Sequence, residues 1–168
     1  IIDDVLELVS AETGLTPLHR KKISASKLLN DIESPFTEAA NKKEQNFQLN
    51  IDDISVKADL QVIRNVIGRL IDNAIKFGKP KTAIKIAAVQ LENGNARFSV
   101  TNKGQSIPQK TIDKILKPFS LDENIMNHTQ GLGIGLSLSQ ALLKNHDSQL
   151  NIECQKGEFT VFLIYVNI

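Results

Sequence analysis

The stretch from Asp59 to Phe77 is the sequence feature that most restricts how this chain can fold. Asp59 is a good helix N-cap, and after it apolar side chains recur every three or four residues along one helical face. These side chains are Ile63, Val66, Ile67, Leu70, Ile71, Ala74 and Ile75. A face this broad cannot be left in water, so the helix is predicted to pack against a large apolar surface.

Strand and turn signals lie on both sides of this helix. Alternating apolar residues predict short strands at residues 20–23, 47–51, 54–57, 83–91, 96–101, 149–154 and 158–166. The dipeptides Asn93-Gly94 and Lys156-Gly157 are typical of tight turns. The strands that flank each dipeptide are therefore predicted to be adjacent and antiparallel.

Further helices are predicted between the strands. Ser24 can cap a helix that continues to Ala39 with a kink at Pro35. A short helix is predicted after Pro108, and another over residues 131–143. This order of elements predicts an α/β fold, a two-layer α/β sandwich in which helices cover one face of a mixed, mostly antiparallel sheet.

The composition of the chain argues against several kinds of function and site. The formal net charge of +1 gives no large basic field for a nucleic acid, so no nucleic-acid partner is expected. The single Cys154 cannot form an internal disulfide, and three scattered histidines do not make a zinc cluster. No apolar run approaches the ~20 residues that cross a bilayer. A cytoplasmic location is expected, and membrane attachment through other parts of a longer protein stays open.

Residues 1–14 differ from the rest of the chain. Apolar residues at positions 1, 2, 5, 8 and 9 form a helical stripe that closes near Gly14, and the stripe begins without a capping residue. We interpret this segment as the end of a longer helix whose packing partner lies elsewhere. The predicted division is therefore 1–14, the end of that helix, and 15–168, one compact domain.

A glycine run at Gly131, Gly133 and Gly135 precedes a predicted helix and follows a polar loop over residues 120–130. Backbone N–H groups at such a helix start can bind a phosphate. Glycines also serve as simple caps, and this explanation stays open. The spacing fits neither a P-loop nor a Rossmann turn, so a phosphate site here requires another architecture.

Two further segments carry polar residues at the ends of predicted elements. Asn73 and Lys76 lie near the end of the apolar helix, where an amide oxygen can bind Mg²⁺ and an ammonium can reach the same phosphates. Asn102 and Gly104 follow a strand. The side-chain amide of Asn102 can hydrogen-bond to the edge of a purine, and Gly104, which has no side chain, lets a ring approach the backbone. Each segment also has a simpler explanation. Asn73 can be a surface residue, with Lys76 compensating the helix dipole. Asn102 and Gly104 can belong to an ordinary turn.

Their order along the chain is more informative than any one of them. Together with Lys117-Pro118-Phe119, these segments resemble the N box, first G box, F box and second G box of histidine kinase catalytic domains. The family is the GHKL ATPase superfamily, whose fold is the Bergerat ATP-binding fold. The segment 1–14 is similar to the end of the dimerisation helix, which carries the phosphoacceptor histidine in this family.

The resemblance implies ATP and Mg²⁺ as ligands. By position Asn73 resembles the metal ligand, Lys76 a phosphate contact and Asn102 the contact to the adenine amino group. The resemblance assigns the remaining nucleotide-site positions to Phe77, Gly104, Ile107, Phe119, Gly131, Leu132, Gly133, Gly135 and Leu136. Residues 120–130 then correspond to a loop that closes over ATP. No residue of the chain is assigned as catalytic.

Three positions depart from the family pattern. Asn102 stands where an Asp is usual, and an uncharged acceptor weakens the hydrogen bond to adenine by roughly 1 kcal/mol. Arg69 stands where hydrolytic relatives place a glutamate base and histidine kinases commonly place Asn. Arginine can neither bind Mg²⁺ nor act as a base, although it can reach a phosphate. Ser106 replaces a glycine.

The resemblance implies transfer of the ATP γ-phosphoryl group to a histidine on a separate dimerisation domain. The implied partners are that domain, a response-regulator receiver domain and a second copy of the full-length protein, while this chain alone could be monomeric. A pseudokinase module with little or no nucleotide binding is the alternative, marked by Arg69 and Asn102. A hydrolytic ATPase is disfavoured because position 69 lacks Glu.

Overall fold

The computed structural model describes residues 17–104, 108–115, 132–144, 146 and 148–165. In chain order its elements are β1 (Lys21–Ser24), α2 (Ala25–Leu29), the 3₁₀ turn η1 (Ser34–Phe36), α3 (Thr37–Lys42), β2 (Asn46–Ile51), β3 (Ser55–Ala58), α4 (Leu60–Phe77), β4 (Ala83–Gln90), β5 (Ala96–Lys103), α5 (Gln109–Ile115), α7 (Leu132–Lys144), β6 (Leu150–Gln155) and β7 (Glu158–Tyr165).

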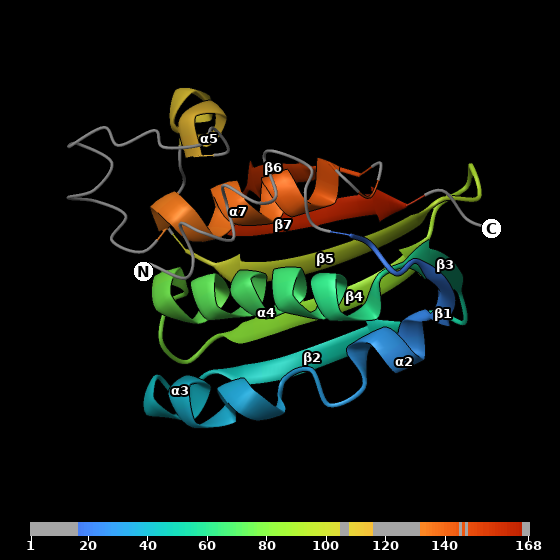
Figure 1. The fold of residues 1–168 in the computed structure, drawn as a ribbon. Coiled ribbons are helices and arrows are strands. Elements are labelled where there is room, and N and C mark those ends of the chain that lie inside the picture. Colours follow the sequence, from blue (N-terminus) through green and yellow to red (C-terminus); the bar gives the residue numbers. More distant parts are fainter. Residues whose placement is uncertain (1–16, 105–107, 116–131, 145, 147, 166–168) are drawn as a thin grey trace.

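A five-stranded sheet with the order β2-β4-β5-β7-β6 forms one layer of the molecule. The strand β2 runs parallel to β4, and every other neighbouring pair in this sheet is antiparallel. Figure 1 shows α4 and α7 lying side by side over one face of the sheet. The predicted two-layer α/β sandwich with a mixed sheet is confirmed.

The helix α4 fills the space between the layers. Its buried apolar residues are those of the predicted face: Ile63, Val66, Ile67, Leu70, Ile71, Ala74 and Ile75. They join one core cluster with Ile84 and Ile86 of β4 and with Phe98 of β5, all nearly inaccessible to water. Burying each of the Ile, Leu, Val and Phe side chains contributes about 1.5–3 kcal/mol, so the interface between α4 and the sheet contributes strongly to the stability of the domain.

Both predicted tight turns are present. Gly94 has a φ of 83°, and the strands on either side of it pair antiparallel. Lys156 and Gly157 have φ values of 51° and 77°, and they connect the antiparallel strands β6 and β7. Two successive residues with positive φ match the twist of a hairpin, which explains why Gly is useful at the second position.

One sequence expectation about the first 60 residues needs correction. The helix predicted from Ser24 to Ala39 is broken into α2, η1 and α3, because Asp31 adopts a φ of 51° and Pro35 begins a new turn. The strands predicted on either side of Asp52-Asp53 are both present. The first, β2, joins the main sheet beside β4, whereas β3 pairs with β1 in a separate two-stranded sheet that was not predicted.

The N-terminus of α4 is tightly capped, as predicted. Asp59 Oδ1 accepts hydrogen bonds from the backbone N–H groups of Gln61 and Val62, and Oδ2 accepts one from His19. The backbone N–H of Asp59 donates to Nε2 of the buried His146, 3.3 Å away. The cap therefore joins the beginning of α4 to the segment after α7.

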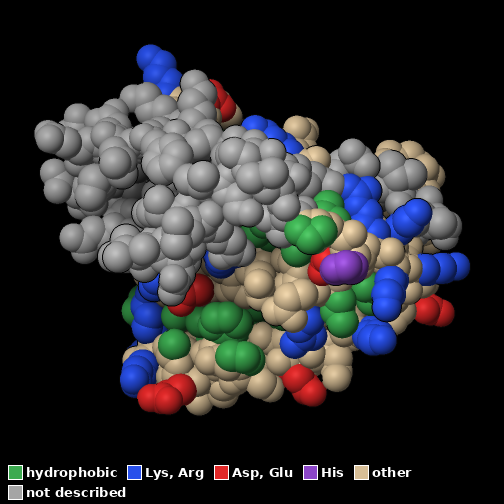
Figure 2. Space-filling model, viewed as in Figure 1, with side chains coloured by type: hydrophobic (Ala, Val, Ile, Leu, Met, Phe, Trp, Pro, Cys, Tyr) green, Lys and Arg blue, Asp and Glu red, His purple; other side chains and the backbone are tan. Residues whose placement is uncertain are grey.

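Charged side chains of both signs lie on the surface of the described residues. On the face shown in Figure 2, blue and red side chains are interspersed among the coloured residues. Among the described residues, no helix combines the length and apolar character that crossing a membrane requires.

We predict that Asp59→Ala lowers the free energy of unfolding at pH 7 by about 1–2 kcal/mol, because three backbone donors lose their acceptor. Urea unfolding measures this difference. Asp53→Ala, at an exposed position in a turn, is the control and should change stability by less than about 0.5 kcal/mol. Equal effects of the two substitutions would contradict the capping role.

The contribution of Asp59 should also depend on pH. Burial raises the pKa of its carboxyl, but the three backbone hydrogen bonds that the carboxylate accepts outweigh burial and hold the pKa below its usual value. A depressed folded-state pKa means that the stabilisation is present above about pH 4 and is lost as the pH falls through the folded-state pKa. The difference in unfolding free energy between the wild type and Asp59→Asn should therefore shrink in acid.

Candidate functional site

The end of α4 carries the first group of sequence-predicted site residues. Asn73 is buried, with 7% of its surface exposed. Its side-chain Nδ2 is buried and has no hydrogen-bond partner among the described residues. A buried amide nitrogen without a partner destabilises a fold, and such groups are most readily tolerated where a ligand or solvent completes them. Asn73 is therefore placed as a site residue would be.

Lys76 lies one turn further along α4 and is solvent-accessible. Its Nζ is 2.7 Å from Oδ2 of Asp72, and about half of each side chain is exposed, at 52% and 46%. An exposed ion pair between residues four apart on a helix contributes only about 0.3–0.5 kcal/mol. Lys76 can therefore exchange Asp72 for a phosphate at little energetic cost.

The end of β5 lies against the end of α4. Asn102 is buried, with 4% of its surface exposed, and Gly104 is buried as well. A Cβ atom added to Gly104 would lie 3.2 Å from Asn102 Nδ2 and 3.2 Å from the backbone oxygen of Phe77. The structure thus brings together Phe77, Asn102 and Gly104, three residues assigned to the same site from the sequence.

The junction between these two ends contains residues that the sequence did not reveal. The backbone N–H of Lys79 donates to the oxygen of Lys103 over 2.8 Å, which joins the exit of α4 to β5. The side chains of Lys43 and Gln45 reach the same junction from the loop between α3 and β2. Of these junction residues, only Gly78 could have been identified from the sequence, because glycine commonly ends an apolar helix.

The helix α7 lies beside α4 and carries the last predicted group. It begins at Leu132, so Gly133 and Gly135 lie in its first turns. Leu136 is fully buried in the core cluster and is therefore a packing residue in this structure. Ile107, Phe119, Gly131 and the loop 120–130 lie outside the described residues, and so does Ser106.

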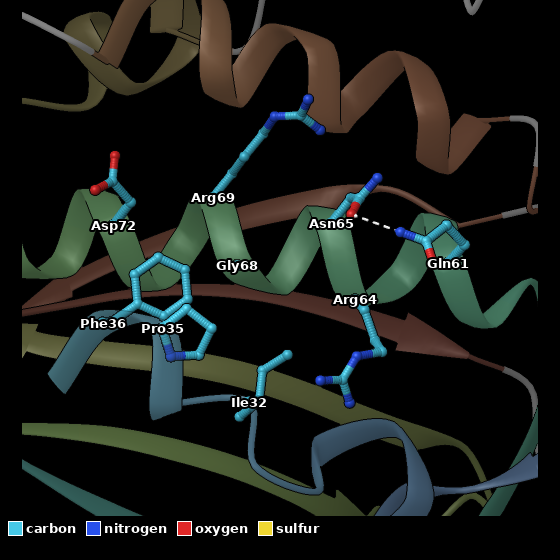
Figure 3. Close-up of a pocket in the computed structure, with 9 residues that line it drawn as sticks. All are labelled: Ile32, Pro35, Phe36, Gln61, Arg64, Asn65, Gly68, Arg69 and Asp72. Atoms are coloured by element: carbon cyan, nitrogen blue, oxygen red, sulfur yellow. Dashed lines mark hydrogen bonds between the residues drawn. The ribbon is translucent and has the colours of Figure 1, made fainter.

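A separate groove of about 490 Å³ runs along the outer face of α4 (Figure 3). Phe36 and Pro35 line one side of it beneath Gly68, and Arg64 and Arg69 extend from α4 on opposite sides. Arg64 Nη1 donates to the backbone oxygens of Leu28 and Asn30, which fixes the end of α2. The groove contains none of Asn73, Phe77 and Asn102, so it is distinct from the candidate site.

The site fits an ion that is bound mainly through a nucleotide. Among the described residues, no group of three or more His, Cys, Asp or Glu side chains could hold a metal. Mg²⁺ commonly takes only one or two protein oxygens and completes its shell with phosphate and water. The amide oxygen of Asn73 can supply one such ligand, and the cationic Lys76 lies one turn away for the phosphates.

We predict opposite effects of alanine at two glycines of α4. At Gly78 an added Cβ would overlap the oxygen of Ala74 and lie 2.7 Å from Gln45 Nε2. Its φ of −70° suits any residue, so the overlap alone should lower the free energy of unfolding by about 1–3 kcal/mol. Gly68 is the matched control, because an added Cβ there meets only Phe36 at 3.5 Å.

Gly68→Ala should leave stability unchanged or raise it by about 0.5–1 kcal/mol, as expected for alanine in a helix interior. Thermal or urea unfolding of both variants makes the comparison. A Gly78→Ala protein as stable as Gly68→Ala would show that the junction is looser than the structure indicates.

Comparisons with known proteins identify the family of this chain. The family model described as histidine kinase-, DNA gyrase B- and HSP90-like ATPase matches residues 58–168. The circadian input-output histidine kinase CikA of Synechococcus elongatus is 28% identical over 171 residues, covering 99% of this chain and 22% of CikA. The chain spans less than half the length of the curated relatives it matches.

Solved structures give the same assignment. The catalytic domain of histidine kinase ThkA has a TM-score of 0.76 and 25% identity, covering 89% of this chain and 96% of that domain. A structure of ThkA with the response regulator TrrA has a TM-score of 0.75 and 21% identity, covering 99% of this chain and 48% of that one. Since the family model covers residues 58–168 and these relatives are histidine kinases, the chain belongs to the histidine kinase-, DNA gyrase B- and HSP90-like ATPase family.

Proposed function

We propose that this chain is the ATP·Mg²⁺-binding catalytic domain of a sensor histidine kinase and that it transfers the ATP γ-phosphoryl group to a histidine of a dimerisation domain. The observation that carries the proposal is the meeting of two element ends. The end of α4, which carries Asn73, Lys76 and Phe77, meets the end of β5 at Phe77, whose backbone oxygen lies beside Asn102 and Gly104. These residues come from separate segments of the chain and match the family positions in order.

Each residue has a role that its chemistry allows. The Asn73 amide oxygen holds Mg²⁺, which would neutralise charge on the phosphates, and the Lys76 ammonium binds phosphate oxygens in place of Asp72. Asn102 accepts a hydrogen bond from the adenine amino group, and Gly104 leaves room beside it because it lacks a Cβ. The N–H groups at the start of α7 bind phosphate. Catalysis is then mainly positioning and charge neutralisation.

The proposed partners follow from the family. We propose that residues 1–14 end the dimerisation helix, that residues 15–168 form the catalytic domain, and that the full-length protein is a homodimer. ThkA is known in complex with the response regulator TrrA. By analogy we propose that the phosphoryl group passes on to a receiver domain.

A pseudokinase is the competing function, and Arg69 is the observation that favours it. Titration with ATP, with and without Mg²⁺, separates the two. The kinase domain should bind ATP more tightly when Mg²⁺ is present. A chain that binds no adenine nucleotide under either condition would instead be a signalling module that acts by docking.

We predict that Asn73→Ala weakens Mg²⁺-dependent ATP binding about tenfold or more, the size expected when a buried contact to a charged group is lost. The melting temperature should change little, because α4 is held by its apolar face. Asn65→Ala is the control on the same helix, since Asn65 is exposed and its side-chain oxygen accepts a hydrogen bond from Gln61 Nε2 on the helix surface. A collapse of the melting temperature in Asn73→Ala would make Asn73 a structural residue.

We also predict that the chain does not phosphorylate itself on histidine. His146 is buried, and its two ring nitrogens face Asp59 N and Leu142 O, so neither is accessible to ATP. His19 lies in an irregular segment before β1, and His128 lies outside the described residues. Incubation with labelled ATP, followed by an assay for acid-labile phosphate, checks this. Labelled phosphohistidine on the chain would contradict the proposed separate acceptor.

A further inference from the structure

The helix α4 ends without the left-handed residue that many helices have at this position. Gly78, at the C-cap, has a φ of −70° and a ψ of 145°, which is extended rather than left-handed. Its N–H donates to the oxygen of Ala74 and completes one bond of the helix. The next backbone donors are diverted: Lys79 N–H binds Lys103 O, and residue 80 is Pro, which has no N–H.

The side chain of Lys43 donates hydrogen bonds to backbone carbonyl groups at the end of α4. Its Nζ donates to the backbone oxygens of Ile75 (2.5 Å), Lys76 (3.0 Å) and Gly78 (2.8 Å). An ammonium has three hydrogens, so all of its donors are used. Burial lowers the pKa of Lys43, because the charged form loses water. The ammonium nevertheless lies at the negative end of the helix, where a positive charge is favoured.

Neighbouring contacts make the arrangement rigid. The backbone oxygen of Lys43 accepts from Lys81 N–H over 3.0 Å. Gln45, which is buried, donates from Nε2 to the oxygen of Lys79 over 3.3 Å. Gly78 leaves just enough space for this amide, since an added Cβ would lie 2.7 Å from it. The loop between α3 and β2 therefore holds the last turn of α4 and the segment that follows it.

This last turn carries residues of the proposed nucleotide site, whereas the loop itself carries none. Lys76 and Phe77 lie in the turn whose carbonyls bind Lys43. The following segment is joined to β5 directly after Asn102 through the bond between Lys79 and Lys103. A change in the direction of the last turn would therefore move Lys76 and Phe77 relative to Asn102.

We propose that Lys43 is a positioning residue of the nucleotide site, which fixes the last turn of α4 so that Lys76 and Phe77 face a nucleotide held at Asn102. This inference rests on the proposed function. Lys43 does not itself touch the nucleotide, because its three donors are occupied by backbone oxygens. The remainder of α4 is held by eight buried residues along its length, so Lys43 acts on its end.

Nucleotide binding by Lys43→Met tests the inference, because methionine keeps the apolar stem and removes the ammonium. The dissociation constant of an ATP analogue with Mg²⁺ should rise about tenfold at a temperature where the variant is fully folded, as expected for the loss of charge-assisted hydrogen bonds. Lys42→Met is the matched control: Lys42 is exposed and forms a surface ion pair with Glu38, so the dissociation constant of this variant should stay within about twofold of the wild type. Lys43→Arg should recover most of the affinity.

Hydrogen exchange without nucleotide provides a second readout. Lys43→Met should speed exchange at the amides of Gly78 and Lys81 and leave those in the middle of α4 unchanged. Unchanged affinity in a folded Lys43→Met protein, or equal losses in Lys42→Met, would overturn the inference and leave the proposed function intact. A wild-type chain that binds no nucleotide would overturn both, and the exchange data would then show Lys43 as a helix cap only.

Discussion

The burial of one face of α4 against the five-stranded sheet is the interaction on which the rest of this structure depends. That face forms the centre of the core. Close packing of side chains such as Ile67, Ile71 and Phe98 fixes the position of the helix on the sheet. Each end of the helix is then tied to a distant part of the chain. Asp59 and His146 hold the beginning, while Lys43 holds the end.

In the proposed function, this arrangement lets one helix serve stability and ligand binding together. The apolar residues that build the core alternate with residues that reach a site, so Asn73 is placed by the packing of its neighbours Ala74 and Ile75. The destabilisation from its unpartnered Nδ2 is small beside the burial along the helix. The position of the site is therefore set by the core, whereas the direction of Lys76 and Phe77 is set by the few hydrogen bonds at the end of α4.

Local patterns accounted for the parts of the structure that sequence reasoning predicted. The cap at Asp59, the face of α4 and the turns at Gly94 and Gly157 all depend on residues close together in the chain. Pairings over long separations were not predictable in the same way. The parallel alignment of β2 with β4 and the contact of Lys43 with the oxygen of Ile75, 32 residues away, arise only when the sheet assembles. Asn73 and Asn102 were assigned to one site only through the resemblance to a known family. The spacing of residues in the sequence does not by itself show which distant segments meet in the fold.

In the proposed function, the ends of α4 and β5 form one nucleotide site. Backbone amide chemical shifts, followed by NMR as an ATP analogue is added with Mg²⁺, show where on the molecule the nucleotide binds. We expect the largest shifts at Asn73 to Gly78 and at Asn102 to Gly104, with smaller changes around Gly68 and Phe36 in the outer groove. Shifts confined to the outer groove, or no shifts at a saturating concentration of nucleotide, would contradict the proposed site.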